Sequence, residues 1–451
     1  MHHIALSCLC LLSMSAVASE VPSQTLAQSE RVQTEVSSLK KRAGEVTSKM
    51  ADLMKQDATS DEAVKLLQEM VDELKQINAR LKQLQEGLDS SKKDISALQK
   101  FQWKGYAQFQ FSDTEEGSNS LGGANRTNND GFTARRIRLS ATHKMDDRTQ
   151  LKVSLDVGGT QRQSVELRDA QLKYDLSKQA SIFAGQQLTP LGYELERSSS
   201  DREMPERAIY NRTLFGGDRM RGIYVRGKVG EGLTATLGVM NSLTVTDPQQ
   251  TDANRFGNLS GTKLAGVAGV RYTTKKGEVG VSGMVGDRAP TSARTITNWT
   301  DSNNNGVVDG GEVRNTNVPA TGSNSRRFIF VDGALYNLVN GLTLRGEFMF
   351  GRDRVPTVSN SVPVSLVDTA LNGYQIQATY AFDLKTSLTA RYESFDPDTG
   401  LSGNTQSAVG LSLAHLLSPD LKLSLTHEWF KEQPFNARNN AWTLRVQYRL
   451  R

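Results

Sequence analysis

Cysteine is nearly absent from this chain. The sequence of 451 residues has two cysteines, Cys8 and Cys10, and both lie close to its start. The remainder of the chain therefore has neither a disulfide framework nor a thiolate metal site. Histidine is also scarce, with five residues in all. His143, His415 and His427 are scattered, and no spacing typical of a catalytic triad or metal site joins them, so we predict that the protein is not an enzyme.

Long apolar runs are missing as well. After residue 18 no stretch approaches the roughly 18 apolar residues that a membrane-spanning helix needs, and the mean hydropathy is −0.47. A helical membrane protein is therefore excluded. The one apolar run, Ile4 to Val17, overlaps the small-residue triplet Ala16-Val17-Ala18, and this pattern predicts a secretory signal over residues 1–18.

A strong excess of one charge is missing too. The chain has 54 Lys and Arg against 49 Asp and Glu, a net charge of +5. The basic residues are spread singly along the chain, whereas nucleic-acid-binding proteins concentrate them on one face or helix. We therefore expect no nucleic-acid partner, and the mild basic excess favours small anionic solutes.

Residues 19–100 are rich in Lys, Gln, Glu and Leu and contain no strand pattern. Apolar residues recur there at alternating spacings of three and four, the period of a coiled-coil seam. The first run is Val36, Leu39, Ala43, Val46, Met50 and Leu53, and the second is Met70, Leu74, Ile77, Leu81, Leu84, Leu88, Ile95 and Leu98. We predict a periplasmic coiled-coil segment over residues 19–100.

The two apolar runs do not share one register. Between them, Thr59-Ser60-Asp61-Glu62 has the pattern of a helix-capping box. Two arrangements stay open: a parallel oligomeric stalk with local over-winding, which would set the number of subunits, or a helical hairpin. A peptidoglycan or periplasmic partner for this segment is a further expectation.

From residue 101 to residue 451 the pattern changes to stretches of about ten residues in which apolar and polar residues alternate. In the last stretch Trp442, Leu444 and Val446 alternate with Thr443 and Arg445. Sixteen such stretches begin near Trp103, Ala134, Gln150, Arg168, Ser181, Gly222, Leu233, Ala265, Glu278, Arg327, Leu342, Gly373, Ser387, Ser407, Leu421 and Ala441.

The connections between these stretches are short on one side, as at Asp383 to Thr386, and long on the other, as at Asp287 to Arg326. An even number of antiparallel strands with this asymmetry is typical of an outer-membrane barrel whose long loops face outward. We therefore predict an all-β transmembrane barrel of about sixteen strands over residues 101–451. It would lie in the outer-membrane lipid of a Gram-negative-type bacterium.

Several segments of this region resemble the phosphate-selective porin O and P family. They are Ala134-Arg-Arg-Ile-Arg-Leu139, Arg168-Asp-Ala-Gln-Leu-Lys-Tyr174, Gly185-Gln186 with Pro190 and Glu194, Glu206-Arg207, Arg219-Met-Arg-Gly222, Asp332 with Gly341 and Glu347, Arg391-Tyr392 with Phe395-Asp-Pro-Asp398, and Arg445-Val-Gln447. The resemblance covers nearly all of residues 103–450. It implies a homotrimer of sixteen-strand pores whose third external loop folds into the lumen.

The stretch from Leu191 to Gly217 stands at the position of that inward loop. Arginine recurs there at every fifth residue, as Arg197, Arg202, Arg207 and Arg212. Guanidinium groups offer parallel N–H donors that suit phosphate or carboxylate, so these four are the predicted anion site at the pore constriction. Acidic residues interleave with them, and salt bridges that hold the loop shut would explain the same pattern.

Strand positions opposite the lipid-facing set form the predicted lumen wall. Its cations are Arg136, Arg138, Lys152, Arg226, Arg271, Arg345 and Arg391. A charged side chain on the lipid face costs about 2–4 kcal/mol at the bilayer midplane, so we expect these residues to face water inside the barrel.

The segment from Asp301 to Glu312, in the longest external loop, matches the twelve-residue calcium loop. The predicted ligands are Asp301, Asn303, Asn305, the carbonyl of Val307, Asp309 and Glu312. Gly306 would allow the sharp turn that this loop needs. The sequence thus predicts a structural Ca²⁺ ion here.

These features together predict an outer-membrane porin, a water-filled channel for passive diffusion of small solutes with a preference for anions such as phosphate. A second hypothesis is an envelope-tethering structural protein in which the coiled coil is the working part and the barrel is its membrane anchor.

Overall fold

The computed structural model describes residues 31–52, 61–115, 130–158, 165–245, 263–288, 294–299, 301–305, 311–318, 323–353, 368–433, 436 and 438–450. The predicted signal segment, residues 1–18, lies outside them. The chain forms two units, Met1–Gln102 and Trp103–Arg451. No helix among the described residues has the length and apolar character needed to cross a membrane.

Two helices make up the described part of the first unit, one over residues 31–52 and α2 over Asp61–Gln99. Two ion pairs join them. Arg42 lies 2.7 Å from Glu73, and Arg80 lies 3.0 Å from Glu35. Glu35 precedes Arg42 in the first helix, whereas its partner Arg80 follows Glu73 in α2. The two helices therefore run antiparallel.

The predicted seam residues form the face on which these helices pack. The buried apolar residues of this unit, among those described, are Val46, Ile77 and Leu84, and all three belong to the predicted runs. The two runs therefore pair with each other as a helical hairpin and not as successive parts of one parallel stalk. The break in register and the capping-box pattern between the runs fit this reversal of direction.

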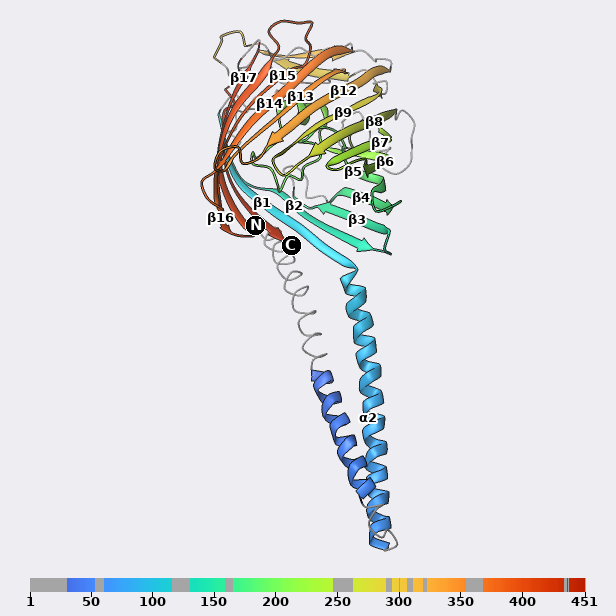
Figure 1. Ribbon diagram of the computed structural model, residues 1–451. Helices are drawn as coiled ribbons and strands as arrows, with labels where there is room; N and C mark the ends of the chain where they lie inside the picture. Colours follow the sequence, from blue (N-terminus) through green and yellow to red (C-terminus); the bar gives the residue numbers. More distant parts are fainter. Residues whose placement is uncertain are drawn as a thin grey trace. The chain divides into compact units, whose positions relative to one another are not determined.

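The second unit is a closed antiparallel barrel of sixteen strands, which confirms the predicted fold (Figure 1). Its strands are β1 (Phe101–Thr114), β2 (Gly131–Lys144), β3 (Thr149–Asp156), β4 (Glu166–Asp175), β5 (Ala180–Leu188), β6 (Arg219–Lys228), β7 (Leu233–Asn241), β8 (Leu264–Thr273), β9 (Gly277–Arg288), β12 (Asn324–Leu335), β13 (Leu342–Asp353), β14 (Thr369–Ala381), β15 (Thr386–Asp396), β16 (Gln406–Ser418), β17 (Leu421–Glu432) and β18 (Ala441–Leu450). Each begins within about four residues of its predicted start.

Each barrel strand pairs with the next barrel strand along the chain, and β9 pairs directly with β12 although an insertion separates them in the sequence. The insertion there contains β10 (Arg294–Trp299) and β11 (Val313–Val318), which pair only with each other. The barrel is closed by β1 and β18, where Gly105 lies opposite Leu450.

The alternation of side chains separates the two faces of the wall. In β18 the side chains of Trp442, Leu444, Val446 and Tyr448 are 37–47% exposed, whereas Thr443, Arg445 and Gln447 are buried. Successive residues of a strand point to opposite faces, so the apolar set faces outward and the polar set faces the lumen.

Candidate functional site

The loop between β5 and β6, residues 189–218, runs inside the barrel, and we call it the inner loop. It contains the short helix α3 (Ile209–Leu214). Ser199 lies 2.6 Å from the hydroxyl of Tyr106 on β1. The carbonyls of Glu206 and Pro205 accept bonds from Arg391 on β15 and Arg445 on β18, at 2.8 and 2.9 Å. The inner loop therefore contacts the wall on β1, on its neighbour β18 and, three strands further around the barrel, on β15.

An apolar core inside the barrel anchors one part of the inner loop. The loop contributes Leu191, Leu195, Tyr210, Leu214 and Phe215, and the wall contributes Met220, Met240, Val267, Met284, Phe328, Phe330 and Met349. The ring centroid of Phe215 lies 5.1 Å from that of Phe328 and 5.8 Å from that of Phe330. These inward-facing apolar side chains occupy wall positions where a fully wet lumen would require polar residues.

Buried charges fix the end of the inner loop. The carboxylate of Asp218 accepts a bond of 2.6 Å from Arg168 and is also paired with Arg207 and Arg219. Burial alone would raise the pKa of Asp218, but the guanidinium groups around it, Arg207 first, hold that pKa well below its usual range. The residue is ionised at neutral pH and ties the loop to β4 and β6.

A second carboxylate, Glu347 on β13, holds the beginning of the inner loop. It accepts bonds from the backbone N–H groups of Tyr193 and Glu194, at 2.5 and 3.0 Å, and from the hydroxyl of Tyr210, at 2.7 Å. Gly192 approaches this carboxylate in a left-handed conformation with φ of 59°. The close approach of the backbone depends on the missing side chain at that position.

Gly192→Ala should prevent the inner loop from packing fully against β12 and β13. A methyl group there would lie 2.7 Å from an oxygen of Glu347 and 2.9 Å from Phe330, in a backbone conformation unfavourable for alanine. We expect a loss of about 1–3 kcal/mol in the free energy of unfolding, measured by urea titration of the barrel in lipid vesicles. Gly266→Ala is the control, because its methyl group would meet only one atom, at 3.9 Å. Equal effects of both variants would contradict this account.

The four arginines predicted at the constriction lie in different surroundings. Arg197 pairs with Glu203 at 3.1 Å, and Arg212 lies 3.8 Å from Glu393. Arg207 is buried, and its partners are Asp218 and backbone carbonyls of the inner loop. Arg202 is buried, and none of its three nitrogens has a hydrogen-bond partner in the described part of the chain. The structure thus does not bring all four to one water-facing ring.

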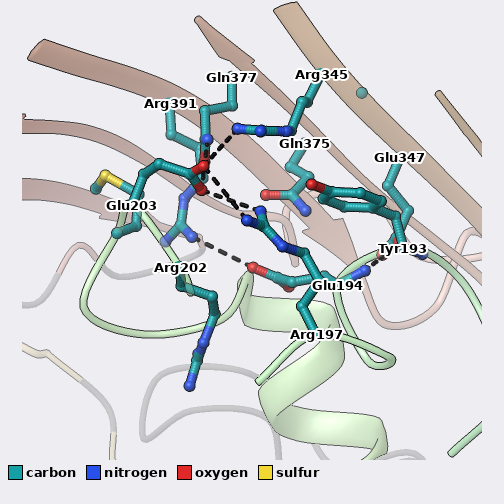
Figure 2. Close-up of a pocket in the computed structure, with 12 residues that line it drawn as sticks. Tyr193, Glu194, Arg197, Arg202, Glu203, Arg345, Glu347, Gln375, Gln377 and Arg391 are labelled. Carbon is teal, nitrogen blue, oxygen red and sulfur yellow. Dashed lines mark hydrogen bonds and ion pairs between the residues drawn. The ribbon is translucent and has the colours of Figure 1, made fainter. Parts of the chain in front are cut away.

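Three arginines instead gather around Tyr193. The guanidinium carbons of Arg197, Arg345 and Arg271 lie 4.9, 5.7 and 5.9 Å from the centre of its ring. We call these three the Tyr193 arginine cluster. Figure 2 shows Glu203 beside it, bonded to both Arg197 and Arg345. The cluster combines one inner-loop arginine with two arginines of the wall.

Two cavities border the Tyr193 arginine cluster. Tyr193, Arg197 and Arg345 line a small space of about 20 Å³, and Arg271 lines a larger space of about 250 Å³ against β6 to β9. The side chain of Arg271 is 23% exposed, while its partner Asp332 is completely buried behind it. The guanidinium group of Arg271, and not the carboxylate of Asp332, is therefore exposed to water at this position.

All seven residues of the predicted lumen wall contact inner-loop residues or acids of neighbouring strands. Arg138 pairs with Asp156 at 2.6 Å, Lys152 with Asp169 at 2.9 Å, and Arg226 with Glu196. The other four are Arg136, Arg271, Arg345 and Arg391, which pair with Glu206, Asp332, Glu203 and the acids Glu194, Glu393 and Glu428. Their role in anion selection stays a prediction.

Glu206 is the centre of another group of arginines. It lies 2.7 Å from Arg136, 3.0 Å from Arg135 and 3.2 Å from Arg445. Burial would raise the pKa of Glu206, but these arginines, with Arg202, lower it well below its usual range. This arrangement supports the scaffolding explanation for part of the charge in the loop.

The predicted calcium loop lies between β10 and β11. Asp301 and Glu312 are both buried, and the backbone N–H of Ser302 donates to Glu312 at 2.8 Å. The N–H of Asn305 donates to the side-chain oxygens of Asp301 and Asn303, at 3.2 and 3.0 Å. The predicted ligands Val307 and Asp309 lie outside the described residues. Among the described residues no three His, Cys, Asp or Glu side chains converge as a metal site.

Comparison with known proteins identifies the barrel. The model of a family described as phosphate-selective porin O and P matches residues 115–450. The chain belongs to this family. No curated protein matches the sequence. The family and the barrel fold indicate an outer-membrane porin channel and not an enzyme.

Solved structures of an anion-selective porin and of the outer membrane protein OmpT share the fold of this phosphate-selective porin family member at low sequence identity. The anion-selective porin from Comamonas acidovorans has a TM-score of 0.53 at 12% identity, covering 78% of this chain and 99% of that one. OmpT of Vibrio cholerae, lacking loop L8, has a TM-score of 0.53 at 12% identity, with the same coverage. Its in-vitro folded trimer form has a TM-score of 0.52 at 11% identity, again covering 78% and 99%.

The sequence pattern of this family member did not single out Tyr193, around which the arginine cluster forms. Tyr193 is the single aromatic residue between Thr189 and Ala208, in a stretch dense in charge. An isolated aromatic side chain among arginines is a signal for cation–π contacts, and it could have marked the cluster in advance.

Proposed function

We propose that this porin conducts small anions in preference to cations, with phosphate and similar oxyanions as its solute class. The observation that carries the proposal is the Tyr193 arginine cluster, which lies between the two cavities described above. Guanidinium groups stay charged at every physiological pH and offer paired donors to an oxyanion. The family's description and the name of the Comamonas acidovorans porin add support.

The wall beside the cluster has the polar character that a passing hydrated ion needs. Arg226, Thr234, Thr236 and Ser282 line the larger cavity together with Arg271. Hydroxyl groups can replace part of an anion's hydration shell, while the arginines supply the positive potential. Selectivity would come from the narrowest part of this path.

Ion selectivity of the purified full-length protein in a planar lipid bilayer tests the proposal. In a tenfold gradient of potassium chloride, we expect a reversal potential of the sign set by chloride, and phosphate added to chloride should block the current in a saturable way. A reversal potential set by potassium would contradict anion preference. An ohmic current that phosphate does not block would contradict an oxyanion site.

We propose in addition that three copies assemble as a homotrimer and that the helical segment lies in the periplasm. A trimer form of OmpT from Vibrio cholerae shares the barrel fold, which supports the first point. The helical segment leads directly into β1 at the end of the barrel that carries the short turns, which supports the second. Its exposed polar faces leave room for a peptidoglycan or periplasmic partner. Cross-linking of the purified protein, resolved by mass, tests the trimer.

We also propose a calcium ion in the loop from Asp301 to Glu312. The supporting observation is that positions 1 and 12 of the motif, both carboxylates, are buried in one connection, with Glu312 bonded to the backbone of Ser302. Sites of the extracellular kind bind Ca²⁺ with Kd values of about 10⁻⁴–10⁻³ M.

Calorimetric titration of the full-length protein with Ca²⁺ tests this site. We expect one saturable binding event that Glu312→Gln abolishes, because the last position supplies the bidentate ligand. Asp368→Asn is the matched control, since Asp368 pairs with Arg352 in another described segment and is absent from the motif. Unchanged binding in Glu312→Gln would refute a calcium site at this loop.

A further inference from the structure

The carboxylate of Glu203 fills the gap between two arginines of the Tyr193 arginine cluster. One of its oxygens accepts a bond of 2.5 Å from Arg345 on β13, and the other accepts a bond of 3.1 Å from Arg197. Gln377 on β14 donates a third bond, at 3.2 Å. Figure 2 shows these bonds converging on the one carboxylate. Two guanidinium groups that share a carboxylate have the geometry that would also receive a free oxyanion.

Glu203 competes with any solute for this position. Burial alone would raise the pKa of Glu203, but Arg197 and Arg345 hold that pKa below its usual value, so the group is an anion at neutral pH. Because the carboxylate is tethered to the inner loop, it acts at an effective concentration of roughly millimolar or above. A free monocarboxylate offers the same two acceptors without this advantage, and a halide offers no such pair.

Little free space adjoins this carboxylate. Tyr193, Arg197, Glu203 and Arg345 border a space of about 20 Å³. On this measure about 10–15 Å³ holds one water molecule. A solute oxyanion therefore cannot bind Arg197 and Arg345 together while Glu203 stays between them. Binding at this point requires that the carboxylate move away.

A further cation stands beside the backbone of Glu203. Lys422 on β17 lies opposite Gln447, whose side chain faces the lumen. The ammonium group of Lys422 donates to the carbonyl of Arg202 at 3.3 Å, and among the described residues no acid pairs with it. Ser412 on β16 donates to the carbonyl of Glu203, also at 3.3 Å, so the wall holds the backbone at this point. Rotation of the Glu203 side chain alone would bring its carboxylate toward Lys422.

We propose that Glu203 is a tethered competitor, which a dianionic oxyanion such as hydrogen phosphate displaces from Arg197 and Arg345 toward Lys422. This inference rests on the proposed anion preference and narrows the solute class to doubly charged oxyanions. Exchange of one anion for another keeps both arginines paired, which avoids the cost of leaving a desolvated guanidinium group alone. The carboxylate returns when the solute leaves, so the solute is bound selectively and still released.

Block of the chloride current through the full-length protein in a planar lipid bilayer tests the proposal. The probes are inorganic phosphate in mildly alkaline buffer, where it is dianionic, and acetate, which is singly charged. The native protein should be blocked by phosphate at a much lower concentration than by acetate. Equal block of the native protein by the two anions would overturn the proposal without the use of any variant.

Glu203→Gln removes the competing charge. We expect the half-blocking concentration of phosphate to fall by about tenfold or more, since the solute no longer replaces hydrogen bonds between charged groups. Acetate should then block as well. Glu278→Gln is the matched control, because Glu278 pairs with Arg271 of the same cluster but does not lie between Arg197 and Arg345. An equal gain in both variants would show that net charge alone is responsible and would overturn the proposal.

Lys422→Gln tests where the displaced carboxylate goes. We expect this change to raise the half-blocking concentration of phosphate in the native background and to have little effect when combined with Glu203→Gln, as a double-mutant cycle would reveal. The same effect in both backgrounds would show that Lys422 acts on the solute directly and would overturn the displacement.

The same currents separate this inference from the proposed function. If phosphate blocks the native protein and Glu203→Gln at equal concentration, the competitor role falls and the anion preference stands. If phosphate blocks neither protein, there is no oxyanion site in the channel, and both proposals fall together.

Discussion

Asp218→Asn should lower the free energy of unfolding of the barrel by about 3–5 kcal/mol, because it removes the one carboxylate shared by Arg168, Arg207 and Arg219. All four side chains are largely buried, so water cannot replace the lost charge. The end of the inner loop would be released with it. We therefore expect larger and noisier single-channel currents, in addition to unfolding at lower urea concentration.

Asp201→Asn is the matched control for this prediction. Asp201 pairs with Arg449 at 2.9 Å, but its side chain is 51% exposed. Exposed ion pairs contribute about 0–1 kcal/mol, so this variant should behave almost as the native protein. Similar stability of the two variants would show that the buried charges do not hold the loop.

The pH dependence of the Asp218 contribution follows from the direction of its shift. Because the surrounding arginines lower the pKa of Asp218, its stabilising effect is complete above the unfolded value of about 3.9 and is lost as the pH falls through the lower folded value. The native protein should therefore keep this contribution across the whole neutral range. The difference between native and Asp218→Asn protein should shrink only in strong acid.

Combined replacement of Arg197, Arg271 and Arg345 by glutamine should reverse the ion preference of the channel. Their partners Glu203, Glu278 and Asp332 would remain without compensating charge. At about 8 Å in water, one unit charge changes the energy of a passing ion by about 0.5 kcal/mol. Three such charges amount to about 1.5 kcal/mol, or roughly tenfold in relative occupancy. The reversal potential in a salt gradient measures this change.

The control removes the same number of positive charges outside the lumen. Lys144, Arg148 and Lys178 lie exposed at the short-turn end of the barrel. Their combined replacement by glutamine keeps the net charge equal to that of the cluster variant but leaves the path unchanged. An equal shift of the reversal potential in both variants would show that net charge, and not the Tyr193 arginine cluster, sets the preference.

The barrel was predictable because each strand carries its own signal. Alternation requires only neighbouring residues, so β7, β13, β17 and β18 began at the predicted residues Leu233, Leu342, Leu421 and Ala441. The helical hairpin was predictable only in part. The apolar positions of each helix could be identified in the sequence, but the helix against which they pack could not. A coiled-coil period does not say whether the matching helix is in the same chain.

The apolar core inside the barrel was missed although the sequence carried a trace of it. The run Phe328-Ile329-Phe330-Val331 is apolar at four successive positions, where alternation alone would place two polar residues. Phe328 and Phe330 face inward against Phe215. A break in the alternation within a barrel strand is thus a signal for a lumen filled by its own loop.

The partners of the arginines could not be predicted. Arg168 and Asp218 are 50 residues apart, and Arg345 and Glu203 are 142 apart. Which acid meets which arginine depends on the path of the inner loop, and that path follows from packing against several strands at once. The even spacing of four arginines suggested one site. In the structure Arg207 is buried in ion pairs within the scaffold, whereas Arg197 borders a cavity.

The closure of the barrel by β1 and β18 has a consequence for biogenesis. The buried side chains of Gln108 and Gln447, bonded at 2.7 Å, are 339 residues apart. Bringing such distant residues together costs roughly 5 kcal/mol of chain entropy before any contact compensates. The first strand must therefore wait, unpaired on one edge, until the last strand has been synthesised and delivered. Closure of the barrel is therefore the last pairing to form, and the cell must protect an open sheet until then.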